Sequence, residues 1–194
     1  MKFKIFNYKE VNSTNDIAID LIKKKNYENG VVFALKQKKG RGRYGRKWVS
    51  KKGNLFTSIF FNLRKNFPNV REFTLINAML NIDVLKSYCK KSKIEFKEPN
   101  DIFLNKKKIC GILQETIVKG RKRYLIIGIG INVVSNPLIK KYPSTNLLFE
   151  TKKKNNPKKI VIKICNEYSK FFKNLDRYDS ENFKIKSKNL LMKA

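Results

Sequence analysis

Three guanidinium groups and three glycines lie together in the stretch Gly40-Arg41-Gly42-Arg43-Tyr44-Gly45-Arg46-Lys47-Trp48. The chain has only eight arginines and draws most of its positive charge from lysine, so this clustering is selective. A guanidinium is planar and donates paired hydrogen bonds that match phosphate and carboxylate oxygens. Glycines let the backbone approach a ligand closely. Residues 40–48, the arginine loop, are therefore predicted to bind an anion.

The absence of histidine restricts the chemistry available to any site in this chain. Ser-His-Asp and Cys-His catalysis and histidine-ligated metal centres are excluded. The cysteines Cys89, Cys110 and Cys165 are far apart and odd in number, which fits neither a disulfide framework nor short zinc-ligand spacings. We expect them to be small core residues. Catalysis must then use Lys, Arg, Asp, Glu and bound ions.

The formal net charge of +30 has two interpretations. A basic surface can neutralise phosphates and so bind nucleic acid. Lysine is, however, spread over nearly every segment together with abundant Asn, Ile and Phe, which favours a bias in composition over a clustered nucleic-acid footprint. In either case we expect a weak, salt-sensitive affinity for polyanions.

The surroundings of the arginine loop favour a small-molecule pocket. The loop does not lead into a predicted helix, as a dinucleotide-binding fingerprint does, and the P-loop pattern is absent. Arginine-glycine segments that bind DNA or RNA usually belong to disordered tails. This loop is instead bracketed by β-rich runs at residues 31–37 and 54–63. Its glycines and like charges predict mobility that a ligand reduces.

Hydrophobic periodicity predicts the elements that position this loop. The expected strands are residues 3–11, 31–37, 54–63, 94–96, 102–104, 109–118 and 123–133. Three helices are expected. One follows a cap at residues 13–16, one spans residues 71–91, and one starts at Asn156-Pro157 and runs to residue 175. Short turns at residues 105–107 and 119–121 indicate antiparallel hairpins. The pattern predicts an α+β fold with a mixed, mainly antiparallel sheet backed by helices.

Length and hydropathy limit the number of domains and exclude a membrane-spanning segment. With 194 residues and 41% hydrophobic residues, it is expected to bury one core as a single domain. Residues 1–11 contain no continuous apolar stretch, and no apolar run is long enough to span a membrane. We therefore expect a soluble, cytoplasmic protein without a membrane partner.

Five segments, in order, resemble motifs of the biotin protein ligase family. They are Ser13-Thr14-Asn15 (S-T-N), Gln37 with residues 40–48 (Q-x-x-G-R-G-R-x-G-R-x-W), residues 97–101 (K-W-P-N-D), residues 107–115 (K-K-x-x-G-I-L-x-E) and residues 128–132 (G-x-G-I-N). Order and spacing agree from about Val11 to Val133, and the arginine loop is the most specific match. The resemblance implies the class II aminoacyl-tRNA synthetase-like fold of the biotin–lipoate ligase catalytic domain.

The resemblance also implies an activity. Members of this family join biotin and ATP into biotinyl-5′-AMP with release of pyrophosphate, then transfer biotin to one lysine of a biotin carboxyl carrier protein domain. The carrier would belong to acetyl-CoA carboxylase or another biotin-dependent carboxylase. ATP and Mg²⁺ are the implied cofactors and biotin is a substrate. Attack of a carboxylate on a phosphate needs mainly positioning and charge neutralisation, which suits a site without histidine.

Site residues follow from the matched motifs. The resemblance implies that Arg43 and Lys108 are catalytic, with Arg43 bridging the biotin carboxylate and the α-phosphate and Lys108 neutralising the same junction. Biotin-binding residues by resemblance are Ser13, Thr14, Asn15, Gln37, Gly42, Arg43, Tyr44, Lys108 and Gly111. Adenylate-binding residues by resemblance are Arg41, Arg46, Trp48, Asn100, Asp101 and Asn132. Asp101 is also the implied Mg²⁺ ligand.

Some of these residues have a second interpretation. Residues 13–15 can be a helix cap as well as partners of the ureido ring. Trp48 can be a core residue or can cover the adenylate. Pro99-Asn100-Asp101 is also an ordinary turn. Glu98 replaces the tryptophan of the family motif and places an acid beside a phosphate site.

The motif positions predict where the catalytic domain begins and ends. Two other functions remain as alternatives to biotin ligation. Residues 1–178 are expected to form the catalytic domain and residues 179–194 a short C-terminal tail, with no DNA-binding domain and no full C-terminal barrel. We expect a monomer or weak homodimer without specific DNA binding. The alternatives are a lipoate or octanoate ligase-like transferase, whose motif has a glycine run and a His-Asp pair at the arginine loop, and a basic nucleic-acid-binding module without catalysis.

Overall fold

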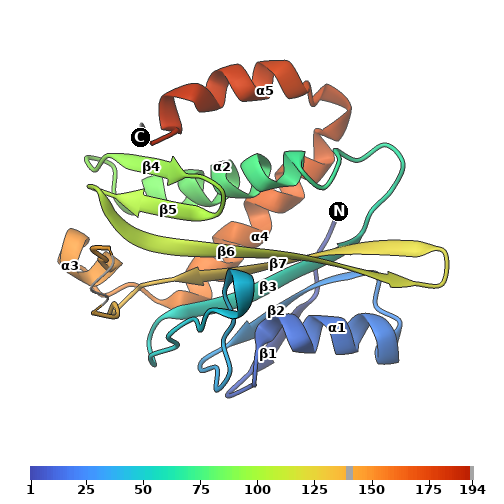
Figure 1. Cartoon of the computed structure of the whole chain (residues 1–194), viewed down its shortest axis with the longest axis horizontal. Helices are drawn as coiled ribbons and strands as arrows, with labels where there is room; N and C mark the ends of the chain where they lie inside the picture. Colours follow the sequence, from blue (N-terminus) through green and yellow to red (C-terminus); the bar gives the residue numbers. More distant parts are fainter. Residues whose placement is uncertain (139–141, 193–194) are drawn as a thin grey trace.

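A seven-stranded sheet with the order β1-β2-β3-β7-β6-β5-β4 forms the middle of the protein in a computed structural model, which describes residues 1–138 and 142–192 (Figure 1). The strands are β1 (Ile5–Tyr8), β2 (Asn29–Ala34), β3 (Leu55–Asn62), β4 (Ile94–Lys97), β5 (Asp101–Leu104), β6 (Lys107–Lys119) and β7 (Lys122–Ile131). β1 pairs with β2 in parallel, and the other neighbours pair antiparallel. The predicted mixed, mainly antiparallel sheet is confirmed.

Helices cover both faces of this sheet. α1 (Thr14–Lys25) lies on one face, and α2 (Glu72–Lys86) and α4 (Pro157–Lys173) lie on the other (Figure 1). The shorter elements are α3 (Leu147–Thr151), α5 (Ser180–Ser187), and the 3₁₀ turns η1 (Arg43–Gly45), η2 (Leu175–Arg177) and η3 (Lys188–Leu190). The predicted start of α4 is confirmed, because Asn156 accepts a hydrogen bond from the Lys158 amide and proline follows it.

Alternation along β7 separates the core from the side of the sheet that carries α1. Ile127, Ile129 and Ile131 are buried in the cluster that packs against α2 and α4. Gly128 and Gly130 alternate with them and so face the opposite side. The sequence Gly-Ile-Gly-Ile therefore supplies core packing on one face and free space on the other.

Three local predictions differ from the structure. The helix predicted over residues 71–91 ends at Lys86, where Ser87 turns back and donates its hydroxyl to the Val84 carbonyl. Ser13 takes the N-cap position of α1, but its side chain makes no capping hydrogen bond. Asn29 and Gly30, which lie before the predicted strand 31–37, belong to β2 and pair with β3.

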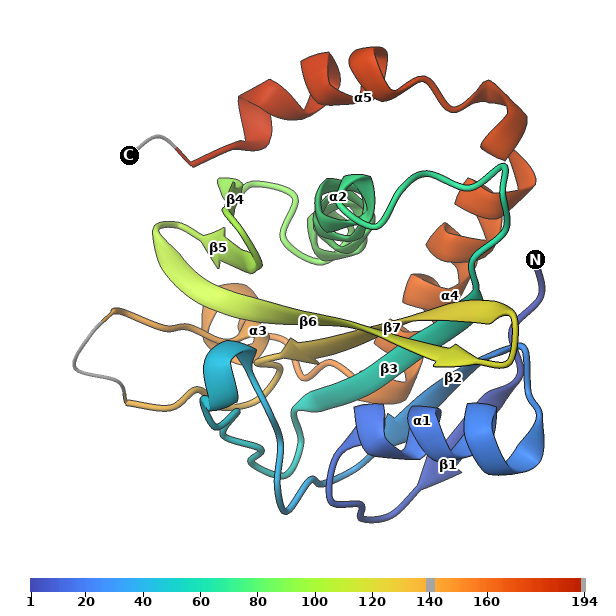
Figure 2. The same cartoon turned by 45° about the vertical axis from the view of Figure 1, so that its right-hand side comes forward.

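Residues after Tyr178 pack against the domain rather than extending from it. Asp179 caps α5 by accepting from the amides of Glu181 and Asn182. The chain then returns to the edge strand β4, where Leu191 bridges Phe96 in parallel and the Met192 amide donates to the Phe96 carbonyl at 2.8 Å (Figure 2). The end of the described chain thus covers one sheet edge.

The three cysteines are buried and unbonded, as the sequence predicts. Burial raises the pKa of the Cys89 thiol to about 11 and that of Cys165 to about 12, and it also raises the pKa of Cys110. A thiol held in its neutral form is a poor nucleophile, so these residues serve packing. Among the described helices, none combines the length and apolar character needed to cross a bilayer.

Candidate functional site

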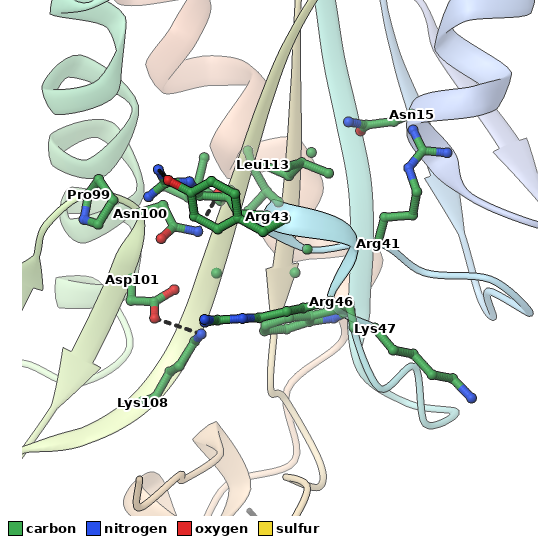
Figure 3. A pocket seen from close by; sticks show the side chains of 18 of the residues that line it. Asn15, Arg41, Arg43, Arg46, Lys47, Pro99, Asn100, Asp101, Lys108 and Leu113 are labelled. Atoms are coloured by element: carbon green, nitrogen blue, oxygen red, sulfur yellow. Dashed lines mark hydrogen bonds and ion pairs between the residues drawn. The ribbon is translucent and has the colours of Figure 1, made fainter. Parts of the chain in front are cut away.

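A cavity of about 540 Å³ opens between the start of α1, the arginine loop, the corner before β5 and the middle of β6 and β7 (Figure 3). Every residue predicted for the site lines it except Asn132. Further lining residues are Lys47, Lys97, Glu98, Pro99, Phe103, Ile112, Leu113, Gly128, Ile129, Gly130 and Tyr142. The fold therefore brings together segments that lie up to 129 positions apart in the chain, from Ser13 to Tyr142.

One end of the cavity, the Thr14 end, is a connected set of polar side chains formed by Thr14, Asn15, Gln37 and Ser58. The Thr14 amide and hydroxyl donate to Gln37 Oε1 at 2.8 and 3.2 Å. Ser58 Oγ lies 2.8 Å from Thr14 Oγ1 and donates to Asn15 Oδ1. Because Ser58 is fully buried and Thr14 and Asn15 almost so, their donors and acceptors are held in fixed directions.

The polar set continues to the arginine loop through Ser50. Gln37 Nε2 donates to Ser50 Oγ at 3.1 Å, and Ser50 Oγ donates to the Trp48 carbonyl at 3.2 Å. The Trp48 amide in turn donates to the Gly40 carbonyl at 2.9 Å. A Cβ on Gly40 would lie 2.7 Å from Ser50 Oγ, so only glycine fits this crossing. The two ends of the arginine loop are thereby fastened to the Thr14 end.

Glycines on β6 and β7 form the floor on which Trp48 lies. A Cβ on Gly130 would approach Trp48 Nε1 to 2.5 Å, and one on Gly111 would approach Cζ3 to 2.7 Å. A Cβ on Gly128 would lie 2.5 Å from Asn15 Oδ1. These strand positions are therefore closed to any side chain. Trp48 lines the cavity and belongs to neither core cluster, and its contact with the adenylate stays a prediction.

The opposite end, the Lys108 end, is formed by Lys108, Asp101, Trp48 and Tyr142. Lys108 Nζ pairs with Asp101 Oδ2 at 2.7 Å (Figure 3), and only 12% of the lysine side chain is exposed. Its ammonium also lies 5.6 Å from the Trp48 ring centroid and 5.0 Å from that of Tyr142. Asp101 Oδ1 and Trp48 Nε1 are buried and have no hydrogen-bond partner among the described residues. This end presents a fixed cation and two unsatisfied polar atoms.

Arg41, which the resemblance implies as an adenylate contact, pairs with two carboxylates of this chain. Its guanidinium donates to Asp16 in the first turn of α1 and to both oxygens of Glu115 on β6 at 3.1–3.2 Å. Figure 3 shows it extending towards Asn15, away from Lys108. Burial opposes the charge, but the hydrogen bonds and the attraction of both carboxylates outweigh it and raise the pKa of Arg41. Through the carboxylates of Asp16 and Glu115, Arg41 thus holds the arginine loop against α1 and β6.

The tip of the arginine loop has fewer attachments. Tyr44 lies in the left-handed region with φ 55°, and 82% of it is exposed. Arg43 Nη2 donates to the Tyr44 hydroxyl at 2.9 Å, and its guanidinium carbon lies 4.9 Å from the ring centroid. Tyr44 therefore supports Arg43 at the cavity mouth. Arg46 follows at the C-terminal end of the turn and extends in the direction of Lys108 (Figure 3).

The corner before β5, at Asn100, is hydrogen-bonded to β6. Asn100 Nδ2 donates to the Ile112 carbonyl at 3.0 Å, and the Ile112 amide donates to the Asn100 carbonyl at 2.9 Å. These bonds hold the start of β5 against β6, where the Asp101 carboxylate reaches the Lys108 ammonium. Glu98, which replaces the tryptophan of the family motif, is exposed and lines the cavity at this corner.

Asn132, which the resemblance implies as a nucleotide contact, does not line the main cavity. It is only 2% exposed, and its Nδ2 donates to the Thr145 carbonyl at 3.0 Å. It lines a small adjoining cavity of about 30 Å³, which it shares with Trp48, Lys108 and Tyr142. The side-chain amide thus holds the Thr145 backbone, and its contact with the nucleotide stays a prediction.

Three residues of the site have no motif match, and Glu115, the last residue of the matched segment 107–115, was not expected to pair with Arg41. Asp16 and Glu115 hold Arg41, Ser58 completes the Thr14 end, and Tyr142 faces Lys108. Strand alternation offered a signal for Ser58, a polar residue between Phe56 and Phe60 on one face of β3. Tyr142 carried no such signal, since it lies outside any periodic segment.

Comparisons with known proteins agree with this geometry. A model of the biotin/lipoate A/B protein ligase family matches residues 8–132. The bifunctional ligase/repressor BirA of Escherichia coli is 34% identical over 125 residues, which cover 63% of this chain and 38% of that protein. A biotin–[acetyl-CoA-carboxylase] ligase of Paracoccus denitrificans is 32% identical over 108 residues, which cover 55% of this chain and 45% of the relative. The matches thus span less than half the length of these curated relatives.

A solved structure extends the likeness to nearly the whole chain. The biotin protein ligase of Leishmania major in complex with biotinyl-5-AMP superposes with a TM-score of 0.85 at 25% identity. The superposition covers 97% of this chain and 81% of that one. The predicted family resemblance is confirmed in both sequence and fold.

Proposed function

Because the chain belongs to the biotin/lipoate A/B protein ligase family, we propose that this cavity joins biotin to AMP and then releases biotin to a carrier lysine. The observation that carries the proposal is that one cavity holds a prearranged polar end and, opposite it, a buried lysine paired with Asp101. A molecule with a polar ring, an apolar chain and a carboxylate fits such a cavity. The complex of a related ligase with biotinyl-5-AMP supports this choice.

Biotin is proposed to lie with its ureido ring at the Thr14 end. The ring offers one carbonyl acceptor and two N–H donors, and this end holds hydroxyl and amide groups of both kinds. Ser13 and the glycine backbone at Gly42 line the same end. Leu113, which pairs with Gly128 across β6 and β7, lines the cavity as an apolar group along which the aliphatic chain would run. The carboxylate would then point to the Lys108 end.

Adenylate formation would take place between Lys108 and the tip of the arginine loop. A carboxylate oxygen of biotin attacks the α-phosphorus of ATP, and the bond to the bridging oxygen of pyrophosphate breaks. Negative charge is shared by the non-bridging oxygens, and Lys108 and Arg43 would neutralise it. Asp101 holds Lys108 in place through its ion pair. Arg46 and Trp48 are proposed to contact the nucleotide, while Arg41 fixes the loop.

The proposal includes Mg²⁺ bound with ATP. The described residues contain no group of three or more His, Cys, Asp or Glu side chains that could hold a metal by themselves. Asp101 Oδ1 is buried and unpaired at the Lys108 end, so it is a suitable single ligand. Magnesium is commonly bound by one or two carboxylates together with substrate phosphates. The residues present fit such a site, in which Mg²⁺ would supply charge neutralisation at the phosphates.

In the second step a carrier lysine amine attacks the biotinyl carbonyl carbon, and AMP leaves. We propose a carboxylase carrier domain as acceptor, because one relative is named for acetyl-CoA carboxylase. We propose that this reaction takes place in the cytoplasm. Residues 1–178 would supply the catalytic domain, acting as a monomer or weak homodimer. Relatives named as both ligase and repressor do not support the prediction of no specific DNA binding.

The proposal is tested by exchange of labelled pyrophosphate into ATP, which reports adenylate formation alone. We expect exchange that depends on biotin and is not supported by lipoate or octanoate. Arg43→Ala should reduce it by about 100-fold, the effect of removing one group that stabilises transition-state charge. Lys47→Ala, on the same loop, is the matched control and should retain exchange within a few-fold. Exchange with lipoate but not biotin would overturn the choice of substrate, and no exchange with either acid would overturn the proposed function.

A further inference from the structure

Asn54, directly before β3, makes an unusual set of contacts with the chain that leaves β7. Its Oδ1 accepts from three successive amides, those of Val133, Val134 and Ser135, at 2.9, 3.0 and 3.2 Å. Its Nδ2 donates to the Ser135 carbonyl at 2.7 Å. Successive N–H groups that converge in this way form a concave binding site for an acceptor. A side chain that is only 3% exposed thus fills this site and fixes three residues at once.

The neighbouring glycine lets Asn54 reach this position. Gly53 has φ +91°, a conformation that side chains rarely adopt, and a Cβ there would lie 3.1 Å from Val134 Cγ2. The Gly53 backbone therefore packs directly against the Val134 side chain. The next residue, Leu55, is fully buried at the start of β3. Asn54 therefore connects residues 133–135, which follow β7, to the sheet.

The segment that Asn54 holds reaches the Lys108 end of the cavity. We call residues 132–138 and 142–146 the β7–α3 segment, which runs on the side of the molecule where η1 lies (Figure 2). Its returning part brackets Lys108: the Lys108 amide donates to the Pro143 carbonyl, and the Thr145 amide donates to the Lys108 carbonyl, both at 2.9 Å. Tyr142, on the same part, faces the Lys108 ammonium.

We propose that Asn54 is a positioning residue for the Lys108 end. By fixing residues 133–135, it positions the residues that follow them, which hydrogen-bond the returning part. Asn136 Nδ2 donates to the Ser144 carbonyl at 3.0 Å, and Ser144 Oγ donates to the Pro137 carbonyl at 2.6 Å. Asn54 itself does not line the cavity. A catalytic group works only when the residues around it hold its geometry within a few tenths of an ångström. The effect on catalysis rests on the proposed function, whereas the effect on the segment does not.

The structural part is tested by hydrogen exchange of peptides that cover residues 133–138. Asn54→Ala removes the acceptor, so we expect the amides of residues 133–135 to exchange at least about tenfold faster, which corresponds to about 1.4 kcal/mol of local stability. Asn54→Asp keeps an acceptor oxygen and should retain most of the protection. Asn81→Ala is the matched control, because it removes another buried asparagine, which donates to the Asn77 carbonyl within α2. It should leave the amides of residues 133–135 unchanged.

The kinetic part uses the same variants in the exchange assay. Asn54→Ala should raise the KM for ATP by about tenfold and leave the KM for biotin within about twofold, with Asn54→Asp close to the natural protein. If Asn54→Ala does not fold, Asn54→Ser replaces it and should fall between the other two. Equal changes in both KM values, or the same ATP effect from Asn81→Ala, would overturn the positioning role. If the natural protein makes no adenylate but the hydrogen-exchange pattern holds, the proposed function fails and the structural role of Asn54 stands.

Discussion

The Thr14 end and the Lys108 end of the cavity differ in how completely their polar groups are paired within the chain. At the Thr14 end, Thr14, Asn15, Gln37 and Ser58 hydrogen-bond one another in a continuous set. At the Lys108 end, Asp101 Oδ1 and Trp48 Nε1 have no partner in the described parts of the chain. Native proteins leave few buried polar groups unpaired, so such atoms identify where an additional partner fits.

In the proposed reaction, the Thr14 end recognises biotin and the Lys108 end carries out the chemistry. A fully paired polar end is rigid, because each donor and acceptor is held by its neighbours. It can read the shape and hydrogen-bonding pattern of one substrate. The Lys108 end instead keeps charge and unpaired polar atoms in a buried place, where electrostatic interactions are strong. Substitutions at the two ends should therefore change different kinetic constants.

The largest expected effect is at the Lys108 end. Lys108→Met should lower kcat for pyrophosphate exchange by about 100- to 1,000-fold, because a cation is removed from the site of developing negative charge. Biotin binding, measured by calorimetry, should change little in enthalpy if the ureido ring lies at the Thr14 end. Lys106→Met, on the exposed β5–β6 turn, is the control and should keep full exchange. A loss of biotin binding as large as the loss of exchange would mean that the two ends are not separate.

The glycine floor gives the next largest effect. Gly130→Ala places a Cβ about where the Trp48 indole lies, so the ring must move. We expect the KM for ATP to rise by about 10- to 100-fold, since the ring is proposed to contact the nucleotide. Trp48 is the only tryptophan, so a shifted emission maximum reports the displacement directly. Gly120→Asn, in the β6–β7 turn with φ +56°, serves as control. An unchanged emission maximum and KM in Gly130→Ala would contradict this packing.

A smaller effect, on the KM for biotin rather than for ATP, is expected at the Thr14 end. Ser58→Ala removes the hydroxyl that joins Thr14 and Asn15, so the KM for biotin should rise by about tenfold with the KM for ATP nearly unchanged. Thr57→Val is a matched control, because it removes a buried hydroxyl that bonds the Val32 carbonyl rather than a residue that lines the cavity. It should cost about 1 kcal/mol of stability without raising either KM. If both variants weaken biotin equally, the effect is general loosening rather than recognition.

The smallest effect concerns the anchor of the arginine loop. Glu115→Gln weakens one of the two ion pairs of Arg41, whose side chain is 36% exposed. Partly exposed pairs contribute little, so we expect a loss of at most about 1 kcal/mol, or a fall in Tm of about 2–4 °C. The difference between variant and natural protein should shrink in 1 M salt, where ion pairs are screened. A Tm difference that is independent of salt would show that the charge of Glu115 is not what matters.

The sequence predicted most of the fold because strands and helices with strong periodicity form as expected. The β-rich runs at residues 54–63, 109–118 and 123–133 became β3, β6 and β7, and the cap at Asn156 started α4. Helix ends were less accurate, because tertiary contacts such as the turn at Ser87 decide where a helix stops. The short helix α3 has too few residues to show periodicity.

The site was predicted from motifs as far as motifs name residues. Lys108, Asp101 and the arginine loop were found this way and line one cavity. The motifs did not indicate that Arg41 would turn towards Asp16 and Glu115, because that choice depends on which carboxylates the folded chain places nearby. The bonds of Asn54 to residues 133–135 likewise join parts of the chain about 80 positions apart, which no local pattern encodes.

The central claim is that one rigid polar end binds biotin and the opposite charged end joins it to AMP. The most direct measurement is a crystal structure of the protein with biotinyl-5′-AMP. We predict the ureido ring within hydrogen-bond distance of Thr14 or Gln37 and the phosphate within reach of Lys108, with Trp48 against the nucleotide. A structure with the adenine at the Thr14 end, or with the phosphate held by Arg41 after it has left Asp16 and Glu115, would contradict the account.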